Sequence, residues 1–547
     1  MTDVHVRPRR PARTALWLIG AGAVQALCFA PGPLPGWSLP FVQIASLAIL
    51  AAFTWRAARP RQAALYGWIF GLAQFSIGVY WLTISMHRFG GLALPLAVAA
   101  LLLFAAAMAL YGAGACALTA WLCAAHRRPE QAAGRQILNA VAWASAWTLF
   151  EWLRGTLLTG FPWLNIGYAH AEGMFAAWAP FVGVYGVAWL AAFAAGAVAL
   201  MVRAKDTPYD RSAAATIALT LLTGLLGIAW THIDWARSQG EPLIVRLVQP
   251  ATPQSEKFDP ARFQAAQDQA RRLAGLPAKT PQDRPALVVL PETVMPAFQD
   301  QVPDAVWQPW MTLARDLDAA LVMGLPLHVS AAGADRYTNS ATVILPDAQR
   351  PPLAAGQWHY DKHHLVPFGE FIPPGFHWFV RAMDIPLGDF DRGALGQPPL
   401  LLDGQALAVN ICYEDAFGEE IAATVAPGED GRPGASILVN LSNLAWFGDT
   451  WALRQHLWIS RMRALETARP VIRATNTGMT AAIDPDGQVR GALDPARPGV
   501  LDVEVQGAQG LTPYVRWGNA PILAWTALWL LLAWRRRGAP AREESGS

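Results

Sequence analysis

Long apolar runs separated by short polar connections fill the first 235 residues of the chain, and one more run follows near the C-terminus. A helix needs roughly 20 apolar residues to cross the hydrocarbon of a bilayer. Eight runs approach that length: 14–30, 38–56, 64–86, 92–124, 137–154, 174–202, 213–232 and 519–534. The pattern predicts eight membrane-spanning helices, and the run 92–124 is long enough to tilt or to include a re-entrant piece.

Basic residues concentrate in every second connection, which predicts how the chain crosses the membrane. They are Arg7, Arg9, Arg10 and Arg13; Arg56, Arg59 and Arg61; Arg127, Arg128 and Arg135; Arg203, Lys205 and Arg211; and Arg535, Arg536 and Arg537. Cytoplasmic loops carry an excess of Lys and Arg. We therefore expect both termini in the cytoplasm and the polar region 235–515 outside it. The first run resembles a signal peptide, but its Cys28-Phe29-Ala30-Pro31 end is a poor cleavage site, so we expect an uncleaved anchor.

Between Leu243 and Val505 the pattern changes to short runs rich in Val, Ile, Leu and Ala, bounded by Pro, Gly, Asp and Asn. Such runs are typical of strands, and they lie at 243–250, 286–291, 319–325, 340–346, 406–412, 435–441, 470–475, 478–483 and 499–505. Helical stretches at 260–273, 306–318 and 451–468 separate several of them, which predicts a layered α/β domain. The predicted organisation is a seven-helix bundle over 1–235, an extracytoplasmic domain over 236–508, and a final helix with a basic and polar tail over 509–547.

Composition supports a membrane protein. The 547 residues are 53% hydrophobic and 15% charged, against roughly 45–50% and about 25% in soluble domains. The net charge of +2 gives no argument for nucleic-acid binding.

The cysteines direct attention to one thiol. Cys28, Cys116 and Cys123 lie in apolar runs, where we expect small buried side chains, whereas Cys412 alone lies in the polar region and cannot form a disulfide within it. The sequence has no His-Glu-x-x-His pattern and no metal-ligand spacing of cysteines, so we expect no metal or other cofactor.

Three reactive residue types follow predicted strands. Glu292 comes directly after 286–291, Lys362 lies in a turn between apolar flanks, and Cys412 ends a buried strand. A thiol needs a base or a nearby positive charge to become a nucleophile at neutral pH. Glu292 can take its proton, and Lys362 can stabilise the thiolate and the oxyanion that forms when an acyl carbonyl is attacked. The sequence therefore predicts nucleophilic catalysis by Cys412.

In this order and these contexts, the three residues resemble the Glu-Lys-Cys triad of the nitrilase superfamily, the carbon–nitrogen hydrolases. The downstream runs Leu438–Gly448, Gln455-His456, Arg463–Glu466 and Arg473–Gly478 resemble it as well. Fusion of such a domain to seven preceding spans and one following span is similar to the apolipoprotein N-acyltransferases. This resemblance implies an αββα sandwich beside the helix bundle.

The resemblance also implies a ping-pong reaction. Cys412 would take an acyl chain from a phospholipid, with phosphatidylethanolamine the expected donor, and pass it from a thioester to the free α-amino group of an N-terminal diacylglyceryl-cysteine on an apolipoprotein. Glu292 would be the general base and Lys362 the oxyanion stabiliser. Glu370, Tyr413 and Glu414 would complete the pocket, with Trp446 and Phe447 on a loop near it. The expected setting is a monomer in a bacterial inner membrane with a periplasmic catalytic domain.

Several of these assignments have a structural alternative. Glu370 and Glu414 also suit a structural ion pair or turn contact, Tyr413 a core aromatic, and Trp446 and Phe447 membrane-interface anchors. The pair Glu151 and Arg154 either pins helices or contacts a lipid headgroup. The apolar segment 368–386, with Phe371, Ile372, Phe376, Trp378, Phe379, Met383 and Ile385, is either a lid that dips into the bilayer or a packing segment.

Leu444 and Phe258 depart from the family pattern, which commonly has an acidic residue and a Trp at these places. These departures affect loop details and lipid preference, and neither touches the triad. Two other functions are compatible with the same sequence: a membrane-tethered amidase with the same triad, and a transporter or scaffold whose outer domain only binds ligand. The scarcity of ionisable residues inside the runs disfavours the transporter.

Overall fold

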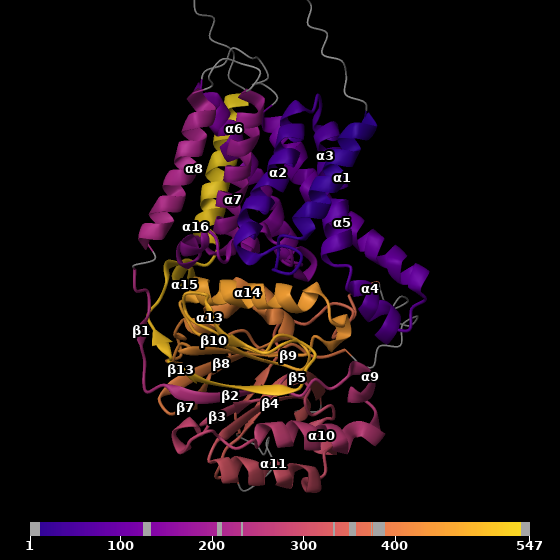
Figure 1. The fold of residues 1–547 in the computed structure, drawn as a ribbon, viewed down its shortest axis with the longest axis vertical. Coiled ribbons are helices and arrows are strands. Elements are labelled where there is room, and N and C mark those ends of the chain that lie inside the picture. Colours follow the sequence, from indigo (N-terminus) through magenta and orange to yellow (C-terminus); the bar gives the residue numbers. More distant parts are fainter. Residues whose placement is uncertain are drawn as a thin grey trace, which may run out of the picture.

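The computed structural model describes residues 11–123, 133–204, 211–230, 233–331, 334–348, 357–373, 375 and 389–537. Figure 1 shows a layer of long helices at one end of the molecule and an α/β domain at the other. Arg7, Arg9, Arg10 and Lys205, the connection 124–132 and most of the apolar segment 368–386 lie outside the described residues.

Each of the eight apolar runs falls on a helix. The helices are α1 (Pro11–Ala26), α2 (Leu39–Arg56), α3 (Pro60–Gly78) with α4 (Leu82–Ile84) and η2 (Ser85–Phe89), α5 (Leu94–Leu122), α6 (Ala133–Thr156), α7 (Ala179–Ala204), α8 (Arg211–Trp230) and α16 (Ala520–Arg537). The long helices lie side by side at one end of the molecule, whereas α4 lies next to the α/β domain (Figure 1). The glycines of α3 and α5 allow a close approach, because a Cβ on Gly67 would lie 2.3 Å from the Gly112 carbonyl oxygen.

Four helices in the described part of the chain are long and apolar enough to cross a membrane: Gly36–Arg56, Leu94–Leu122, Ala176–Met201 and Ala213–Trp230. The pair Pro60–Gly78 and Leu82–Phe89, bent by 59°, makes a fifth if it forms one span. The eight predicted spans are therefore matched by helices, but only four or five meet the length and composition of a span. The others are short or carry charge: α1 has 16 residues, α6 contains Glu151 and Arg154, and α16 ends in three arginines.

Two six-stranded sheets form the α/β domain. One has the order β13-β2-β3-β4-β5-β6 and the other β12-β11-β10-β9-β8-β7. The strands of the first are β13 (Gly499–Val505), β2 (Leu243–Gln249), β3 (Leu287–Val289), β4 (Ala320–Ala331), β5 (Ala334–Ile344) and β6 (His359–Asp361). Those of the second are β12 (Val489–Ala492), β11 (Ala481–Ile483), β10 (Val471–Thr475), β9 (Ile437–Ser442), β8 (Gln405–Ile411) and β7 (Leu400–Leu402). All nine predicted strands are confirmed as strands; the short β6, β7 and β12 were not predicted.

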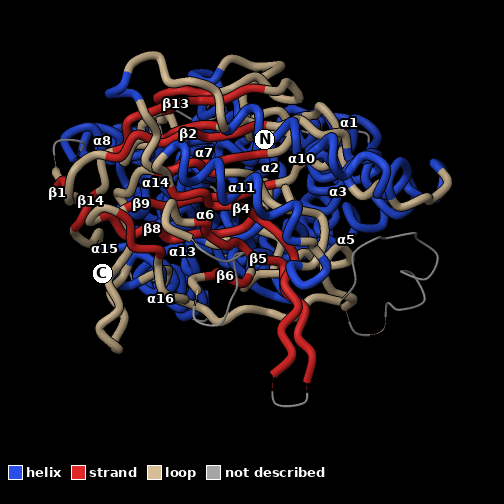
Figure 2. Tube along the Cα trace, turned by 90° about the horizontal axis from the view of Figure 1, so that it is seen from below, coloured by secondary structure: helices blue, strands red, loops and turns tan. Residues whose placement is uncertain are grey.

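Helices cover both outer faces of the paired sheets, so the predicted αββα layering is confirmed. Buried residues of both sheets share one core between them, whereas α10 (Pro260–Ala274) and α11 (Asp304–Leu317) pack on the outside of the first sheet. The second sheet is covered by α13 (Gly418–Val425) and α14 (Trp451–Thr467). Figure 1 places α14 between this sheet and the helix layer, and Figure 2 shows the β4–β5 hairpin projecting from the domain.

Helix α14 is buried along nearly its whole length because it has neighbours on both sides. A single hydrophobic core joins it to the helix layer, with Trp81 and Trp163 on one side and Leu457 and Met462 on the other. The second sheet therefore faces the helix layer through α14, and the two halves of the chain meet at this helix.

Candidate active site

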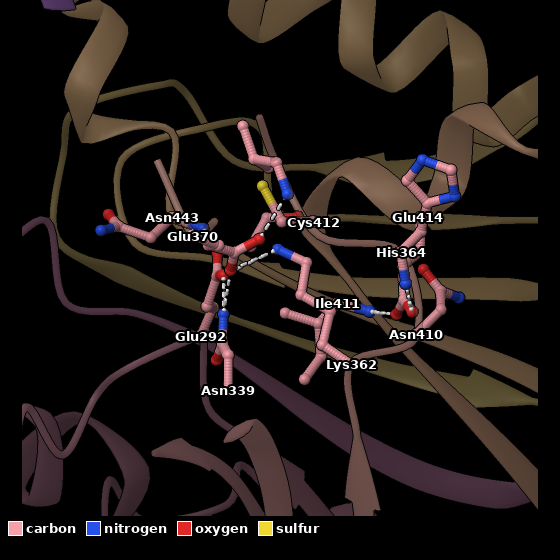
Figure 3. Close-up of polar contacts among 12 residues, drawn as sticks. Glu292, Asn339, Lys362, His364, Glu370, Asn410, Ile411, Cys412, Glu414 and Asn443 are labelled. Carbon is pink, nitrogen blue, oxygen red and sulfur yellow. Dashed lines mark hydrogen bonds and ion pairs between the residues drawn. The ribbon is translucent and has the colours of Figure 1, made fainter. Parts of the chain in front are cut away.

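The three predicted catalytic residues come together at the ends of strands from both sheets. Glu292 follows β3, Lys362 follows β6, and Cys412 follows β8 at the start of the short helix η9 (Cys412–Ala416). Glu292 and Lys362 are buried, while Cys412 is partly exposed. Figure 3 shows the Glu292 carboxylate and the Lys362 amine directed toward each other beside the Cys412 sulfur.

A compact ionic network joins two carboxylates to one lysine. Lys362 Nζ lies 2.8 Å from Glu370 Oε1 and 3.4 Å from Glu292 Oε1. Asn339 Nδ2 donates to both carboxylates, at 2.8 Å to Glu292 and 2.6 Å to Glu370. The second oxygen of Glu292 accepts from the backbone N–H of Asn443 at 2.8 Å. Each member of the buried network thus has a partner, as a buried charge requires.

The charges set the protonation states from which the reaction starts. Burial by itself lowers the pKa of Lys362, but Glu370 and Glu292 outweigh it and hold that pKa above its ordinary value, so Lys362 is a fixed cation. Burial and the Glu292 carboxylate raise the pKa of Cys412, although Lys362 and the Asn443 N–H act in the opposite direction. Cys412 therefore rests as a thiol, and its proton must leave as the sulfur attacks.

The backbone of Cys412 is held in an unusual conformation. Its φ of 55° is in the left-handed region, which costs a non-glycine residue on the order of 1 kcal/mol or more. Its carbonyl oxygen lies 3.0 Å from His456 Nε2 and 3.4 Å from Asn440 Nδ2. Since Arg473 donates to His456 Nδ1 at 2.8 Å, Nε2 carries the imidazole proton and donates to Cys412. Burial and Arg473 lower the pKa of His456, which keeps this tautomer neutral.

Glu414 does not face the reacting groups but connects two of the loops that carry them. Its carboxylate accepts from the backbone N–H groups of Ile411, His363 and His364 at 2.6, 2.6 and 3.0 Å, and from the Tyr360 hydroxyl at 2.9 Å. These bonds tie the turn after Lys362 to the end of β8 (Figure 3). Burial raises the pKa of Glu414 to about 7.

Tyr413, Trp446 and Phe447 lie where the domain meets the helix layer. The Tyr413 hydroxyl donates to the Gly160 carbonyl at 3.1 Å, and its ring is parallel to that of Trp163 at 6.4 Å. Phe447 packs on Trp81 with ring centroids 4.3 Å apart. Trp446 contacts Phe89 on η2 at 5.7 Å and Phe258 at 6.4 Å, so the departure at Phe258 still provides an aromatic neighbour.

Gln455 holds three groups of the helix layer against α14. Its side-chain oxygen accepts from the indole N–H groups of Trp81 and Trp163 at 3.1 and 2.8 Å, and its amide donates to the Gly78 carbonyl at 3.0 Å. The ring of Trp163 is also nearly parallel to that of His456, at 5.7 Å. The membrane half of the chain thus contacts the residues that flank the nucleophile.

Glu151 and Arg154 are arranged as a structural pair that holds neighbouring backbone segments together. Arg154 donates to the carbonyl oxygens of Phe161 and Trp163, and Glu151 accepts from the Ile166 N–H at 3.2 Å. Both side chains are buried and 3.5 Å apart. They brace the loop that carries Trp163 against Tyr413.

Two family models match the chain: the apolipoprotein N-acyltransferase N-terminal domain over residues 21–197 and the carbon–nitrogen hydrolase domain over 245–513. The apolipoprotein N-acyltransferase of Bordetella bronchiseptica is 50% identical over 536 residues, 96% of this chain and 97% of that protein. The chain belongs to the apolipoprotein N-acyltransferase family. The family's Ralstonia nicotianae member is 46% identical over 94% of this chain and 92% of its own. An amidase from Nesterenkonia sp. is 22% identical, with a TM-score of 0.32, over 52% of this chain and 96% of that one.

The family resemblance inferred from the sequence is thereby confirmed, and the two matched regions correspond to the helix layer and the sandwich. The structure also adds residues that sequence reasoning missed: Asn339, His456 and Lys257. Lys257 is buried and its Nζ donates to the Glu292 carbonyl at 3.1 Å. His456 could have been found from the sequence, because the Gln455-His456 run resembles the superfamily. No sequence feature pointed to Asn339 or Lys257. No group of three or more His, Cys, Asp or Glu side chains suited to a metal occurs among the described residues.

Proposed function

We propose that this acyltransferase moves an acyl chain from a phospholipid to the α-amino group of the N-terminal diacylglyceryl-cysteine of an apolipoprotein, through a thioester on Cys412. The observation that carries the proposal is the position of Cys412 beside the Glu292–Lys362–Glu370 network (Figure 3), next to Tyr413, whose hydroxyl donates to the Gly160 carbonyl of the helix layer. We place the phospholipid ester and the lipid-anchored peptide between the sandwich and the helix layer, beside this thiol.

In the first half-reaction the Cys412 sulfur attacks the ester carbonyl while Glu292 takes the thiol proton. The negative charge that develops on the carbonyl oxygen is stabilised by the Lys362 ammonium, which its two carboxylates keep protonated. Glu292 then gives its proton to the departing glycerol oxygen, and lysophospholipid leaves. Phosphatidylethanolamine is the donor we propose.

In the second half-reaction the neutral α-amino group attacks the thioester carbonyl. Glu292 takes a proton from the attacking nitrogen and returns it to the sulfur as the C–S bond breaks. The products are an amide on the lipoprotein and the Cys412 thiol.

The supporting residues fall into two groups. Glu370 and Glu414 position the reacting groups: Glu370 holds Lys362, and Glu414 ties the Lys362 turn to the nucleophile. Tyr413, Trp446 and Phe447 form the aromatic surface between the sandwich and the helices, where we place the acyl chains.

We further propose that all eight helices span an inner membrane and that the chain works as a monomer. The divisions are 1–235, 236–508 and 509–547, with the sandwich on the periplasmic side and both termini in the cytoplasm. The alternation of basic connections supports this arrangement. Green fluorescent protein fused after Arg537 should fluoresce, whereas the same fusion after Trp235 should not; the reverse result would contradict the topology.

The test of the reaction is a transfer assay with the full chain in detergent micelles. Phosphatidylethanolamine with a labelled acyl chain is supplied with a diacylglyceryl peptide that has a free amino terminus, and label on the peptide supports the proposal. A matched peptide with an acetylated amino terminus should receive none. Release of ammonia from small amides without phospholipid, and no labelled peptide, would favour the tethered amidase instead.

A further inference from the structure

The site contains two buried lysines with opposite surroundings. Lys362 has carboxylate oxygens of Glu370 and Glu292 at 2.8 and 3.4 Å. Lys257, at the end of α9 (Gln254–Lys257), is 4% exposed and donates to the backbone carbonyl of Glu292 at 3.1 Å. Among the described residues, no carboxylate oxygen lies within 4.0 Å of Lys257 Nζ, the limit for an ion pair.

This difference gives the two amines different chemistry. An ammonium that is fixed between two carboxylates keeps its proton. A buried amine whose partner is a neutral carbonyl loses little electrostatic stabilisation when it gives up its proton. Burial lowers the pKa of Lys257 to about 7, even though the Glu292 carboxylate acts to raise it. Glu292 and Cys412, which follow β3 and β8, are the titratable groups that act on Lys257, and Glu256 is its acidic neighbour on the same helix.

The proposed reaction needs such a group. An α-amino group has a pKa of about 8, so at about pH 7 roughly nine-tenths of the acceptor arrives as an ammonium, which has no lone pair for attack. Two protons must therefore leave the acceptor nitrogen, one from the ammonium before the attack and one during it. Glu292 cannot accept both. A second proton acceptor beside Cys412 and Glu292 would resolve the conflict.

We propose that Lys257 is a second catalytic lysine, which in its neutral form takes the proton of the acceptor's α-ammonium before the thioester is attacked. The inference rests on the proposed function and deepens its second half-reaction. One proton passes from the α-ammonium nitrogen to the Lys257 amine, leaving a neutral α-amine. The amine then attacks, Glu292 carries the second proton from nitrogen to sulfur, and Lys257 afterwards releases its proton to water.

The test separates the two half-reactions. Full-length wild type and Lys257→Met are first acylated with phosphatidylethanolamine, and intact mass follows formation of the acyl-enzyme. The isolated acyl-enzyme is then discharged either with the diacylglyceryl peptide or with hydroxylamine, a weakly basic nucleophile that is mostly neutral at about pH 7. Lys279→Met, at an exposed position, is the matched control.

We expect Lys257→Met to lose more of its rate of discharge by the peptide than of its rates of acyl-enzyme formation and of discharge by hydroxylamine. Its discharge by the peptide should fall at least about tenfold at pH 7, because no neighbouring base then takes the proton of an acceptor that is bound as the α-ammonium. The rising limb of the discharge rate should move from about pH 7 to about pH 8, the value of the free α-amino group. Lys257→Arg, which keeps a cation that cannot lose its proton, should be as slow as Lys257→Met.

Other outcomes would overturn the inference in recognisable ways. Peptide discharge at the wild-type rate in Lys257→Met, or full rescue by Lys257→Arg, would exclude proton acceptance. An equal loss of acyl-enzyme formation or of hydroxylamine discharge would make Lys257 a general electrostatic support. If Lys257→Met does not fold, judged by its thermal unfolding midpoint, Lys257→Arg carries the test. Failure of the wild type itself to acylate would reject the proposed function rather than this inference.

Discussion

The Nε2 atom of His456 lies 3.0 Å from the carbonyl oxygen of Cys412 and donates a hydrogen bond to this oxygen. His456 belongs to α14, the helix between the second sheet and the helix layer, and Gln455 before it is bonded to Trp81 and Trp163. The strained backbone of the nucleophile is therefore held by a helix that is itself held by the membrane half. Through Gln455 and His456, α14 thus connects the helix layer with Cys412.

Replacing His456 should impair the nucleophile without removing it. His456→Ala leaves the Cys412 carbonyl with only the longer Asn440 contact, so we expect acyl-enzyme formation to slow by about 10- to 100-fold, as for other lost positioning contacts. His456→Asn keeps a donor and should recover part of the rate. His359→Ala, at an exposed position, is the control. Equal rates for His456→Ala and wild type would show that the φ of Cys412 does not depend on this contact.

The Asn339 amide should be needed because it holds two carboxylates at one lysine. Without its two hydrogen bonds, Glu292 and Glu370 lose a shared donor and repel each other. We expect Asn339→Leu to lower the rate of acyl-enzyme formation by about 100-fold, the usual cost of one lost donor in a preorganised site. Gln299→Leu removes hydrogen bonds to His328 on the same hairpin, away from the network, and should keep activity. A loss confined to Gln299→Leu would point to the hairpin instead.

These residues illustrate how far the sequence could be interpreted. Apolar runs and strand ends are local patterns, so the helices, the strands and the positions of Glu292, Lys362 and Cys412 could be predicted. Asn339 joins the site because the antiparallel pairing of β4 and β5 places it opposite Pro326, a register that local sequence does not specify. Glu414 was expected at the pocket, and the structure shows its carboxylate bound to backbone N–H groups of two separate loops, which local sequence does not specify.

Alkylation of Cys412 should report its protonation state. Burial raises the pKa of this thiol, so the thiolate fraction is small at neutral pH and grows as the pH rises toward that pKa. We expect iodoacetamide to modify Cys412 slowly at about pH 7 and at a rate that still increases above about pH 9. Lys362→Met removes the cation that lowers the pKa and should slow alkylation further. A rate that levels off below about pH 8 would contradict a resting thiol.

The close packing of β4 behind Glu292 makes Gly324 sensitive to substitution. A Cβ at this position would lie 2.6 Å from the Glu292 Cα and 2.7 Å from the Thr293 nitrogen, so Gly324→Ala must displace the segment that carries the general base. We expect at least about a tenfold loss of acyl-enzyme formation, since small displacements of a catalytic group are costly. Gly20→Ala, where a Cβ meets no atom within 4 Å, should keep the wild-type rate. Full activity in Gly324→Ala would mean that the strand yields without moving Glu292.

The central claim is that Cys412 carries the acyl chain between donor and acceptor. Intact-mass measurement of the purified full chain after incubation with phosphatidylethanolamine tests it most directly, with Cys412→Ala beside the wild type. The account predicts an increase of one acyl group on the wild type, none on the variant, and loss of the acyl group when a diacylglyceryl peptide with a free amino terminus is added. Transfer to the peptide with no acyl mass on the wild type, or with an equal acyl mass on Cys412→Ala, would contradict it.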